Sequence, residues 1–477
     1  MPTLGHYPCR MTTEFVDFYQ PFGGKMDPNN RWIRMANLIP WDMLEEKYAS
    51  HFKAIGRGAK KVRMAFGALI VQQRFGFTDE ETVEQIIENP YLQYFVGLNE
   101  YQGKKAFDST MMVYFRKRIT PEMLEEVNKV LFTEEKKKKP DKKEKKKKND
   151  DNDREPKNKG KLLMDATCAP ADIKYPTDLN LLNDARMKLE AMINEGYLKG
   201  EFGSEKPRTY PRLARKDYLT AAKNKRISEK TLRQAIRKQL NYVKRDLKYA
   251  GKMTLAGLTI IQYAQLHIIK KLFEQQKEMF ETGKHSIPER IVSLSQPHIR
   301  PIVRGKAGAN VEFGAKISIS LVNGYAFTDK ISWENFNEGT IFTEQVEKYK
   351  ERFGFYPKAV IVDKIYRTRA NQEYCRKKGI RLSGPALGRP KIDPKEREKV
   401  KVQERKDISI RNAVEGEFGT GKRKYGLNLI MTKLPITSES VIAVNFFLLN
   451  LEKKLRLLLR QIFYGLFFGK LTGLVGA

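Results

Sequence analysis

Two aspartates stand in short apolar runs that are typical of buried β-strands. Asp165 lies within KLLMDAT (161–167), and Asp363 ends KAVIVD (358–363). A carboxylate in a buried strand is costly unless something compensates its charge, and a divalent cation does so well. One such acid alone is better explained as a turn cap or as the partner of a lysine. Two of them on neighbouring strands would form a metal site.

A pair of carboxylate-held metal ions suits phosphoryl transfer on DNA. Two ions about 4 Å apart activate the attacking oxygen and stabilise the leaving oxygen. Two aspartates alone hold such a pair poorly, so a third carboxylate is expected from a helix near the strand ends. The candidates are Glu415 and Glu417, whose side chains would point about 200° apart on a helix. The predicted cofactor is Mg²⁺ or Mn²⁺, bound as two ions.

The segment that holds these glutamates, RNAVEGEFGTGKRKYG (411–426), nearly matches a nucleotide-binding loop, because Gly416 to Lys422 reads G-x-x-x-x-G-K. A loop of that kind requires a Ser or Thr after the lysine and a hydrophobic strand before the first glycine. Here Arg423 follows the lysine, and the preceding KVQERKDISI is mostly polar. The segment is therefore predicted to be part of a helix that begins near Pro394.

The elements that must position the acids alternate between strands and helices. A helical region follows the first strand. Next come a hairpin around Gly324, a helix, the strand 358–363, a second helix, a short strand and a final helical part. Without the helical region, this order is that of a ribonuclease H-like mixed sheet covered by helices. The first and fourth strands are neighbours in that layout, which would bring Asp165 close to Asp363. The predicted fold class is α/β, with a helical insertion after the first strand and an all-α N-terminal domain.

The N-terminal region has three segments with helical periodicity. A Thr78-x-x-Glu81 capping box opens one of them. Another is expected to begin at an Asp108 or Ser109 cap and to end on the basic cluster Arg116, Lys117 and Arg118. Such a bundle could bind DNA or mediate dimerisation, since a basic helix end is also favoured by the helix dipole.

Composition sets the remaining boundaries. A Lys-rich tract without apolar residues reads as a solvated linker. The predicted parts are a helical N-terminal DNA-binding or dimerisation domain 1–133, a linker 134–160, the first part of the catalytic domain 161–182, a basic helical insertion 183–298, the remainder of the catalytic domain 299–460 and an apolar C-terminal tail 461–477.

The charge of the chain points to a polyanionic partner. Lys and Arg number 90 against 57 Asp and Glu, which gives a formal net charge of +33. A compact body with this excess repels itself unless a polyanion is close by, so DNA or RNA is the first expectation. No segment offers the roughly 18 consecutive apolar residues of a membrane span, and the expectation is no membrane association.

One helix of the insertion, SEKTLRQAIRKQLNYVKRDLKYA, has an apolar stripe and an opposite face with seven cations, among them Arg233, Arg237 and Lys244. Only Glu229 and Asp246 offset those cations. This face is therefore expected to contact nucleic acid, although a basic face can also be merely solvated.

Cysteine and histidine usage excludes other classes of site. Cys9, Cys168 and Cys375 lie far apart without a C-x-x-C pair, and the five histidines form no H-x-x-x-H pair. Neither a disulfide framework nor a zinc cluster fits. The N-terminus has no secretory pattern, so the expected location is cytoplasmic and nucleoid-associated.

The spacing Arg411-x₃-Glu415-x₆-Lys422 resembles the signature around the third acid of DDE transposases of bacterial insertion sequences of the IS-five type. Four further segments are similar to the same group: LLMDATCAPADIKYPTDLNLLNDAR, RPIVRGKAGANVEFGAK, DKIYRTRANQEYC and KKGIRLSGPALGRP. The resemblance, which also includes the N-terminal PYLQYFVGL, covers nearly the whole chain. It implies Asp165, Asp363 and Glu415 as catalytic, metal-binding acids.

The resemblance also implies that Arg411 and Lys422 contact DNA near the scissile end, since a helix places them on the same face as Glu415. The further expected DNA contacts are Lys364, Arg304, Lys306, Arg233, Arg237 and Lys244. The implied activity is that of a transposase that cuts at inverted-repeat ends and joins them to target DNA, as a homodimer on DNA.

Two residues depart from the family signature. Ile408 stands where the family has Tyr, and Asp363-Lys364-Ile365-Tyr366 replaces the family's Asp-Arg-Gly-Tyr, so that Ile365 removes a glycine. These departures keep two alternatives open. One is a transposase relic that only binds DNA, and the other is a ribonuclease H-like nuclease that cuts without joining.

Overall fold

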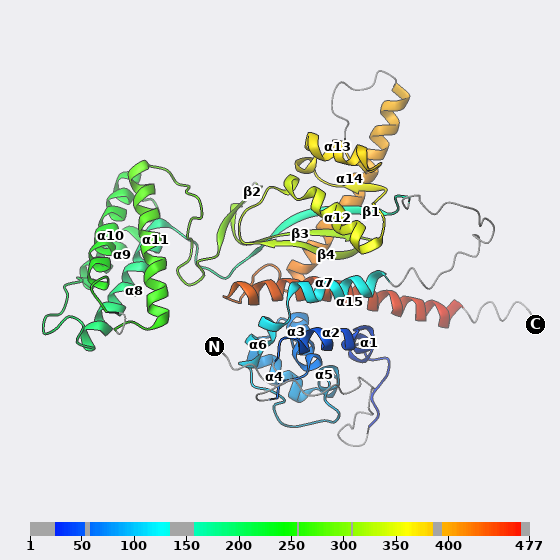
Figure 1. Cartoon of the computed structure of the whole chain (residues 1–477), viewed down its shortest axis with the longest axis horizontal. Coiled ribbons are helices and arrows are strands. Elements are labelled where there is room, and N and C mark those ends of the chain that lie inside the picture. The colour runs from blue at the N-terminus through cyan, green and yellow to red at the C-terminus, as the bar shows by residue number, and fades with distance from the viewer. Residues whose placement is uncertain are drawn as a thin grey trace, which may run out of the picture. The chain divides into compact units, whose positions relative to one another are not determined.

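The computed structural model describes residues 24–52, 58–133, 157–254, 257–306, 309–384 and 394–468. The chain divides into two compact units (Figure 1). The first unit comprises Met1–Pro170, Lys316–Ser332 and Phe336–Ala477, and the second unit comprises Ala171–Ala315 and Trp333–Asn335. Cys9, the expected linker at 134–156 and residues 469–477 lie outside the described residues.

Seven helices form the N-terminal part of the first unit. They are α1 (Arg31–Leu38), α2 (Trp41–Ala49), α3 (Val62–Phe75), α4 (Asp79–Glu88), α5 (Pro90–Phe95), α6 (Met111–Arg118) and α7 (Pro121–Thr133). The last helix of the chain, α15 (Pro435–Phe468), packs against α1, α3, α6 and α7 and also against the sheet. Phe66 of α3 meets Phe447 of α15 edge to face at 5.1 Å, and both side chains are fully buried. Helices α3 and α15, which are far apart in the sequence, therefore share one hydrophobic core.

The predicted capping box is present on α4, where Thr78 and Glu81 exchange hydrogen bonds with each other's backbone N–H. The predicted start of α6 is wrong. Thr110 precedes the helix, and Asp108 instead accepts hydrogen bonds from the backbone and hydroxyl of Thr110. Arg116, one residue of the basic cluster at the end of α6, is 5% exposed and bonds to Asp79 and Gln72. Its role within the bundle is structural.

The sheet has six strands: β1 (Lys161–Pro170), β2 (Arg300–Lys306), β3 (Ala309–Val322), β4 (Tyr325–Ser332), β5 (Ala359–Ile361) and β6 (Arg381–Leu382). Their order is β2-β3-β1-β5-β6, with β4 also paired to β3. The pairs β1–β5 and β5–β6 are parallel, whereas β2–β3 and β3–β4 are antiparallel. The prediction of a mixed α/β sheet is confirmed. Strand β2 was not predicted.

The β1–β5 register places the two strand acids at equivalent positions. Lys161 pairs with Ala359 and Leu163 with Ile361, so paired residues are 198 positions apart in sequence (359 − 161). Asp165 and Asp363 are separated by the same 198 positions (363 − 165). Adjacent strands lie about 4.8 Å apart. Asp165 therefore lies on β1 two residues beyond the paired segment, and Asp363 lies two residues beyond the end of β5, where it caps η4 instead of ending a strand as predicted.

The predicted helices between and after the strands are present as α12 (Phe342–Phe353), α13 (Arg369–Lys377) and α14 (Pro394–Lys424), and two short 3-10 helices that were not predicted, η3 (Glu338–Thr340) and η4 (Lys364–Tyr366), precede α12 and α13. The segment that resembles a nucleotide-binding loop lies inside α14. The glycine at 421 packs closely there, because a Cβ would lie 3.2 Å from Asn445 Oδ1 and 3.3 Å from a Leu427 methyl carbon. The helix prediction for this segment is confirmed.

Four helices form the bundle of the second unit (Figure 1, green): α8 (Asp178–Leu198), α9 (Pro211–Ala222), α10 (Glu229–Ala250) and α11 (Ile260–Thr282). The predicted apolar stripe on α10 faces the core, where Leu240 and Val243 pack with residues of α8 and α11. Helix α8 begins at Asp178, ahead of the insertion boundary expected at 183.

Asp246 is misplaced by the sequence analysis, which put it on the basic outer face of α10. The side chain is fully buried, and its Oδ1 accepts hydrogen bonds from Arg245 at 2.9 and 3.0 Å. Burial raises the pKa of Asp246 to about 7, although Arg245 opposes the shift. The carboxylate therefore does not offset the exposed cations of α10.

The Asp246 carboxyl should make the stability of the helical bundle depend on pH. Its pKa is raised in the folded protein, so its contribution is fully present below the unfolded pKa of about 3.9 and is lost as pH rises through about 7. In the wild type, the free energy of opening of α10 should decrease by about 1–3 kcal/mol between pH 5 and pH 9. We expect Asp246→Asn to abolish this decrease. Hydrogen exchange of α10 amides, corrected for intrinsic rates, measures this quantity. Glu278→Gln on α11 is the control. If the free energy of opening had the same pH dependence in wild type and Asp246→Asn, Asp246 would not be the titrating group.

The structure describes residues at the end of the expected linker and at the start of the expected C-terminal tail. Asn158, in the last residues of the expected linker, donates hydrogen bonds to the carbonyls of Lys378 and Gly379 at 2.8 and 3.1 Å. The expected apolar tail begins within α15, which continues to Phe468. No helix in the described part of the chain is long and apolar enough to span a bilayer.

Candidate carboxylate site at the sheet edge

The two strand acids have the same local geometry. Asp165 Oδ1 accepts a hydrogen bond from the backbone N–H of Ala166 at 2.8 Å, and Asp363 Oδ1 accepts one from Lys364 at 2.7 Å. Each carboxylate is thus turned toward its own backbone by the following residue and keeps its second oxygen for another partner. Asp165 is half-buried, whereas the Asp363 side chain is 54% exposed.

Arg411 of α14 joins the second strand acid to the helix acid. One guanidinium nitrogen lies 3.4 Å from Asp363 Oδ2, and another lies 3.5 Å from Glu415 Oε1. Arg411 is 25% exposed, and Glu415 is 57% exposed. At these distances the pairs are loose and solvated, so they hold the acids together weakly. The arrangement nevertheless gathers two of the three predicted acids around one cation.

Asp165 belongs to the same cluster electrostatically. The pKa of Asp165 is raised to about 6, mainly by burial and also by the nearby carboxylates of Glu338 and Asp363, while the Ala166 N–H and Arg411 oppose the shift. The carboxylates therefore carry more negative charge than Arg411 neutralises. A site of this kind favours an added cation, and carboxylate oxygens are the donors that Mg²⁺ and Mn²⁺ prefer.

Glu338 was missed by the sequence analysis. It lies on η3, and its carboxylate pairs with Lys316 of β3 at 3.1 Å. Lys316 also donates to the Phe336 carbonyl at 2.8 Å. No strand, helix period or family motif marked Glu338, because it stands in a polar loop whose path depends on β3 and α13.

The glycine that the family signature has at 365 is not required by this backbone. The Ile365 side chain is 49% exposed, and its φ is not positive. The close approach occurs on the opposing segment, where a Cβ on Gly339 would lie 2.9 Å from the Ile365 carbonyl oxygen. Tyr366 is fully buried next to this contact. Ile365 therefore points outward without distorting the turn that follows Asp363.

The alternative third acid, Glu417, points elsewhere. Its carboxylate lies 3.6 Å from Lys453 of α15, and it is mostly buried against that helix. Glu415 and Arg411 share the face of α14 that meets Asp363. Among the described residues, no three His, Cys, Asp or Glu side chains are close enough to form a ready-made metal site. Binding of an ion would require the exposed Asp363 and Glu415 side chains to move inward.

The residues predicted to contact DNA lie on several different elements of the structure. Lys364 is exposed beside Asp363, and Lys422 is half-buried farther along α14. On α10, Arg233 donates to the Phe280 carbonyl and stacks on the Phe280 ring, Arg237 lies over the same ring, and Lys244 is exposed. Arg304 and Lys306 lie on β2, but their side chains are outside what the structure describes.

Comparisons with known proteins match two parts of the chain. The family described as Transposase DDE domain matches residues 360–452, which include Asp363, Arg411 and Glu415 but not Asp165. The family described as Transposase domain (DUF772) matches residues 21–118. The chain is 28% identical over 196 residues to a Rhizobium meliloti protein, "Uncharacterized protein ORF8 in nfe locus", a match that covers 41% of this chain and 86% of the relative. No solved structure matches.

Proposed function

We propose that this chain, which carries the two domains typical of insertion-sequence transposases, cuts DNA at inverted-repeat ends and joins the freed ends to target DNA. The observation that carries the proposal is the convergence of Asp363 and Glu415 on Arg411, with Asp165 at the equivalent position of the adjacent strand. A sheet in which β1 lies between β3 and its parallel neighbour β5 supports a ribonuclease H-like catalytic domain.

Asp165, Asp363 and Glu415 are the proposed ligands of two Mg²⁺ or Mn²⁺ ions. Their fit rests on hard oxygen donors and on the excess negative charge around the half-buried Asp165. When bound, the ions would activate the attacking oxygen and stabilise the leaving one. The chain's own contribution is to hold the three carboxylates at one sheet edge, with Asp165 fixed by the rigid strand and Glu415 by α14.

Arg411, Lys364 and Lys422 are proposed to bind the DNA backbone at this edge. Arg411 can exchange its loose contacts with Asp363 and Glu415 for a bidentate contact to a phosphate, which is a stronger pairing for a guanidinium. Lys364 adds an exposed charge beside Asp363. The cations Arg233, Arg237, Lys244, Arg304 and Lys306 are proposed as further backbone contacts. The net charge of +33 supports a DNA partner.

The proposed assembly is a homodimer on DNA, because joining requires two element ends to be held together. The proposed location is the cytoplasm, in association with the nucleoid.

A direct test uses a labelled duplex that carries the terminal inverted repeat bracketing the gene. We expect strand cleavage with Mg²⁺ or Mn²⁺, none after chelation, and joining of a pre-cut end with a free 3′-hydroxyl to a target plasmid. A shifted band without product at any metal concentration would instead favour the DNA-binding relic. Cleavage without joining would favour a nuclease of the same fold.

A further inference from the structure

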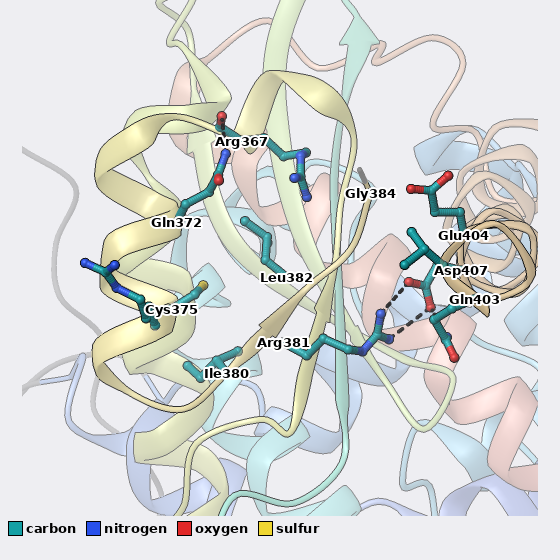
Figure 2. A pocket seen from close by; sticks show the side chains of 12 residues that line it. Arg367, Gln372, Cys375, Ile380, Arg381, Leu382, Gly384, Gln403, Glu404 and Asp407 are labelled. Carbon is teal, nitrogen blue, oxygen red and sulfur yellow. Dashed lines mark hydrogen bonds and ion pairs between the residues drawn. The ribbon is translucent and has the colours of Figure 1, made fainter. Parts of the chain in front are cut away.

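A pocket of about 490 Å³ lies between β6, α13 and the first half of α14 (Figure 2). Its floor is apolar, formed by Cys375, Ile380, Leu382 and Val400. Pockets that bind small organic groups have volumes of about 300–1,000 Å³ and a mainly apolar lining with a few polar groups. This pocket can therefore hold a group of the size of a nucleotide.

The polar residues of the pocket have a surplus of guanidinium groups. Arg367 and Arg381 line it together with two acids, Glu404 and Asp407, and Arg376 adds an exposed guanidinium. Arg381 uses both guanidinium nitrogens to pair with Asp407, at 2.6 and 3.0 Å, and Gln403 donates to the same carboxylate at 2.9 Å. Asp407 is thereby saturated, and the charges of Arg367 and Glu404 offset each other, so the one surplus positive charge is that of the exposed Arg376.

The pocket adjoins the carboxylate site through two elements. Arg367, which is labelled in Figure 2, follows Asp363 by four residues through η4, and its guanidinium donates to the Ser383 carbonyl. On α14, Glu404 precedes Glu415 by 11 residues (415 − 404), which is about 16 Å along the axis at 1.5 Å per residue. One strand of a DNA duplex rises about 3.4 Å per nucleotide. This separation of Glu404 and Glu415 along α14 equals the length of about five nucleotides of one DNA strand.

We infer that this pocket binds one unstacked nucleobase of the substrate DNA, near the position of the cut. The inference rests on the proposed function of the adjoining carboxylates. An apolar floor bounded by guanidinium planes suits a base better than a phosphate, because bases stack on arginine and on apolar side chains. The amide of Gln372 and the carboxylate of Glu404 can meet the polar edge of such a base.

Two exposed valines on α14 provide a matched pair of variants. Val400 lines the pocket and is 43% exposed, whereas Val402 is 38% exposed and does not line it. Val400→Trp should fill the pocket with little effect on folding, and Val402→Trp places the same side chain on the neighbouring surface. We expect Val400→Trp to slow cleavage of the inverted-repeat duplex about 10- to 100-fold and Val402→Trp to change it less than threefold.

The occupant is identified with 2-aminopurine placed singly at the five nucleotides on each side of the cut. We expect wild type and Val402→Trp to increase its fluorescence at one position and Val400→Trp to leave that position quenched. An abasic site at that position should slow wild type but not slow Val400→Trp further. Free dAMP, dGMP, dCMP and TMP are titrated separately, to distinguish a base within DNA from a soluble nucleotide.

The outcomes separate this inference from the proposed function. If wild type binds and cuts ends but no position responds, or if the two tryptophan variants behave alike, the nucleobase site is wrong and the transposase proposal stands. A free nucleotide that binds to the pocket without any response from 2-aminopurine DNA would also overturn it. If wild type neither binds nor cuts ends, the proposed function itself fails.

Discussion

Asp363→Asn is expected to lower strand cleavage by roughly 10³-fold or more while end binding changes by less than threefold. Asn keeps the volume of the side chain but removes the negative charge that an ion requires. Ion-assisted charge stabilisation contributes several kcal/mol, and each 1.36 kcal/mol corresponds to a factor of ten in rate. Asp165→Asn and Glu415→Gln should have effects of the same order. Single-turnover cleavage of a labelled end, together with a gel-shift titration, measures both quantities.

Glu417→Gln is the matched control, because Glu417 lies on the same helix and pairs with Lys453 instead of Arg411. It should retain cleavage within about tenfold of wild type. Loss of cleavage in Glu417→Gln with retention in Glu415→Gln would exchange the roles of the two glutamates. Full cleavage by any of the three acid variants would remove that acid from the mechanism.

Arg352→Met is expected to reduce the free energy of unfolding by about 3–5 kcal/mol. Arg352 is 8% exposed and pairs with Glu125 of α7 at 2.8 Å and with Asp329 of β4 at 2.7 Å. Burial already raises the pKa of Glu125 to about 7 despite the attraction of Arg352. Without the guanidinium, two buried carboxylates would be left unpaired, and unfolding in urea should occur at lower denaturant concentration.

Arg369→Met provides the comparison. Arg369 is exposed at the start of α13, and surface substitutions usually change stability by less than about 0.5 kcal/mol. A loss below about 1 kcal/mol for Arg352→Met would mean that the buried network stabilises the fold far less than its geometry implies. Partial recovery of Arg352→Met stability at pH 5, where Glu125 can be protonated, would link the loss to the unpaired carboxyl groups.

The strands that carry the acids were predictable because both are short apolar runs interrupted by one charge. Leu162, Leu163 and Met164 are all buried in the structure, as a strand covered on both faces requires. The register that aligns Asp165 with Asp363 could not be read from sequence, but the predicted strand order already made the two strands neighbours. Strand β2 escaped prediction because RPIVRGK is dominated by charges, a proline and a glycine, with one inward residue, Ile302.

Charged side chains were the main source of error. Asp246 and Arg116 both stand among cations in sequence, which suggested solvated faces. In the fold both side chains are buried. Asp246 pairs with the adjacent Arg245, and Arg116 pairs with Asp79 of another helix. Periodicity identifies the apolar face of a helix, but it does not reveal which charge turns inward to meet a distant partner. Glu338 was missed for the same reason, since its proximity to Asp165 exists only in three dimensions.

The packing of α15 against the N-terminal helices has a consequence for synthesis of the protein. Phe66 is translated 381 residues before its partner Phe447 (447 − 66). The N-terminal helices therefore keep apolar side chains exposed until α15 has been synthesised. A nonsense or frameshift mutation anywhere upstream of α15 would release a chain whose first domain lacks part of its own core, which marks that chain for aggregation or proteolysis.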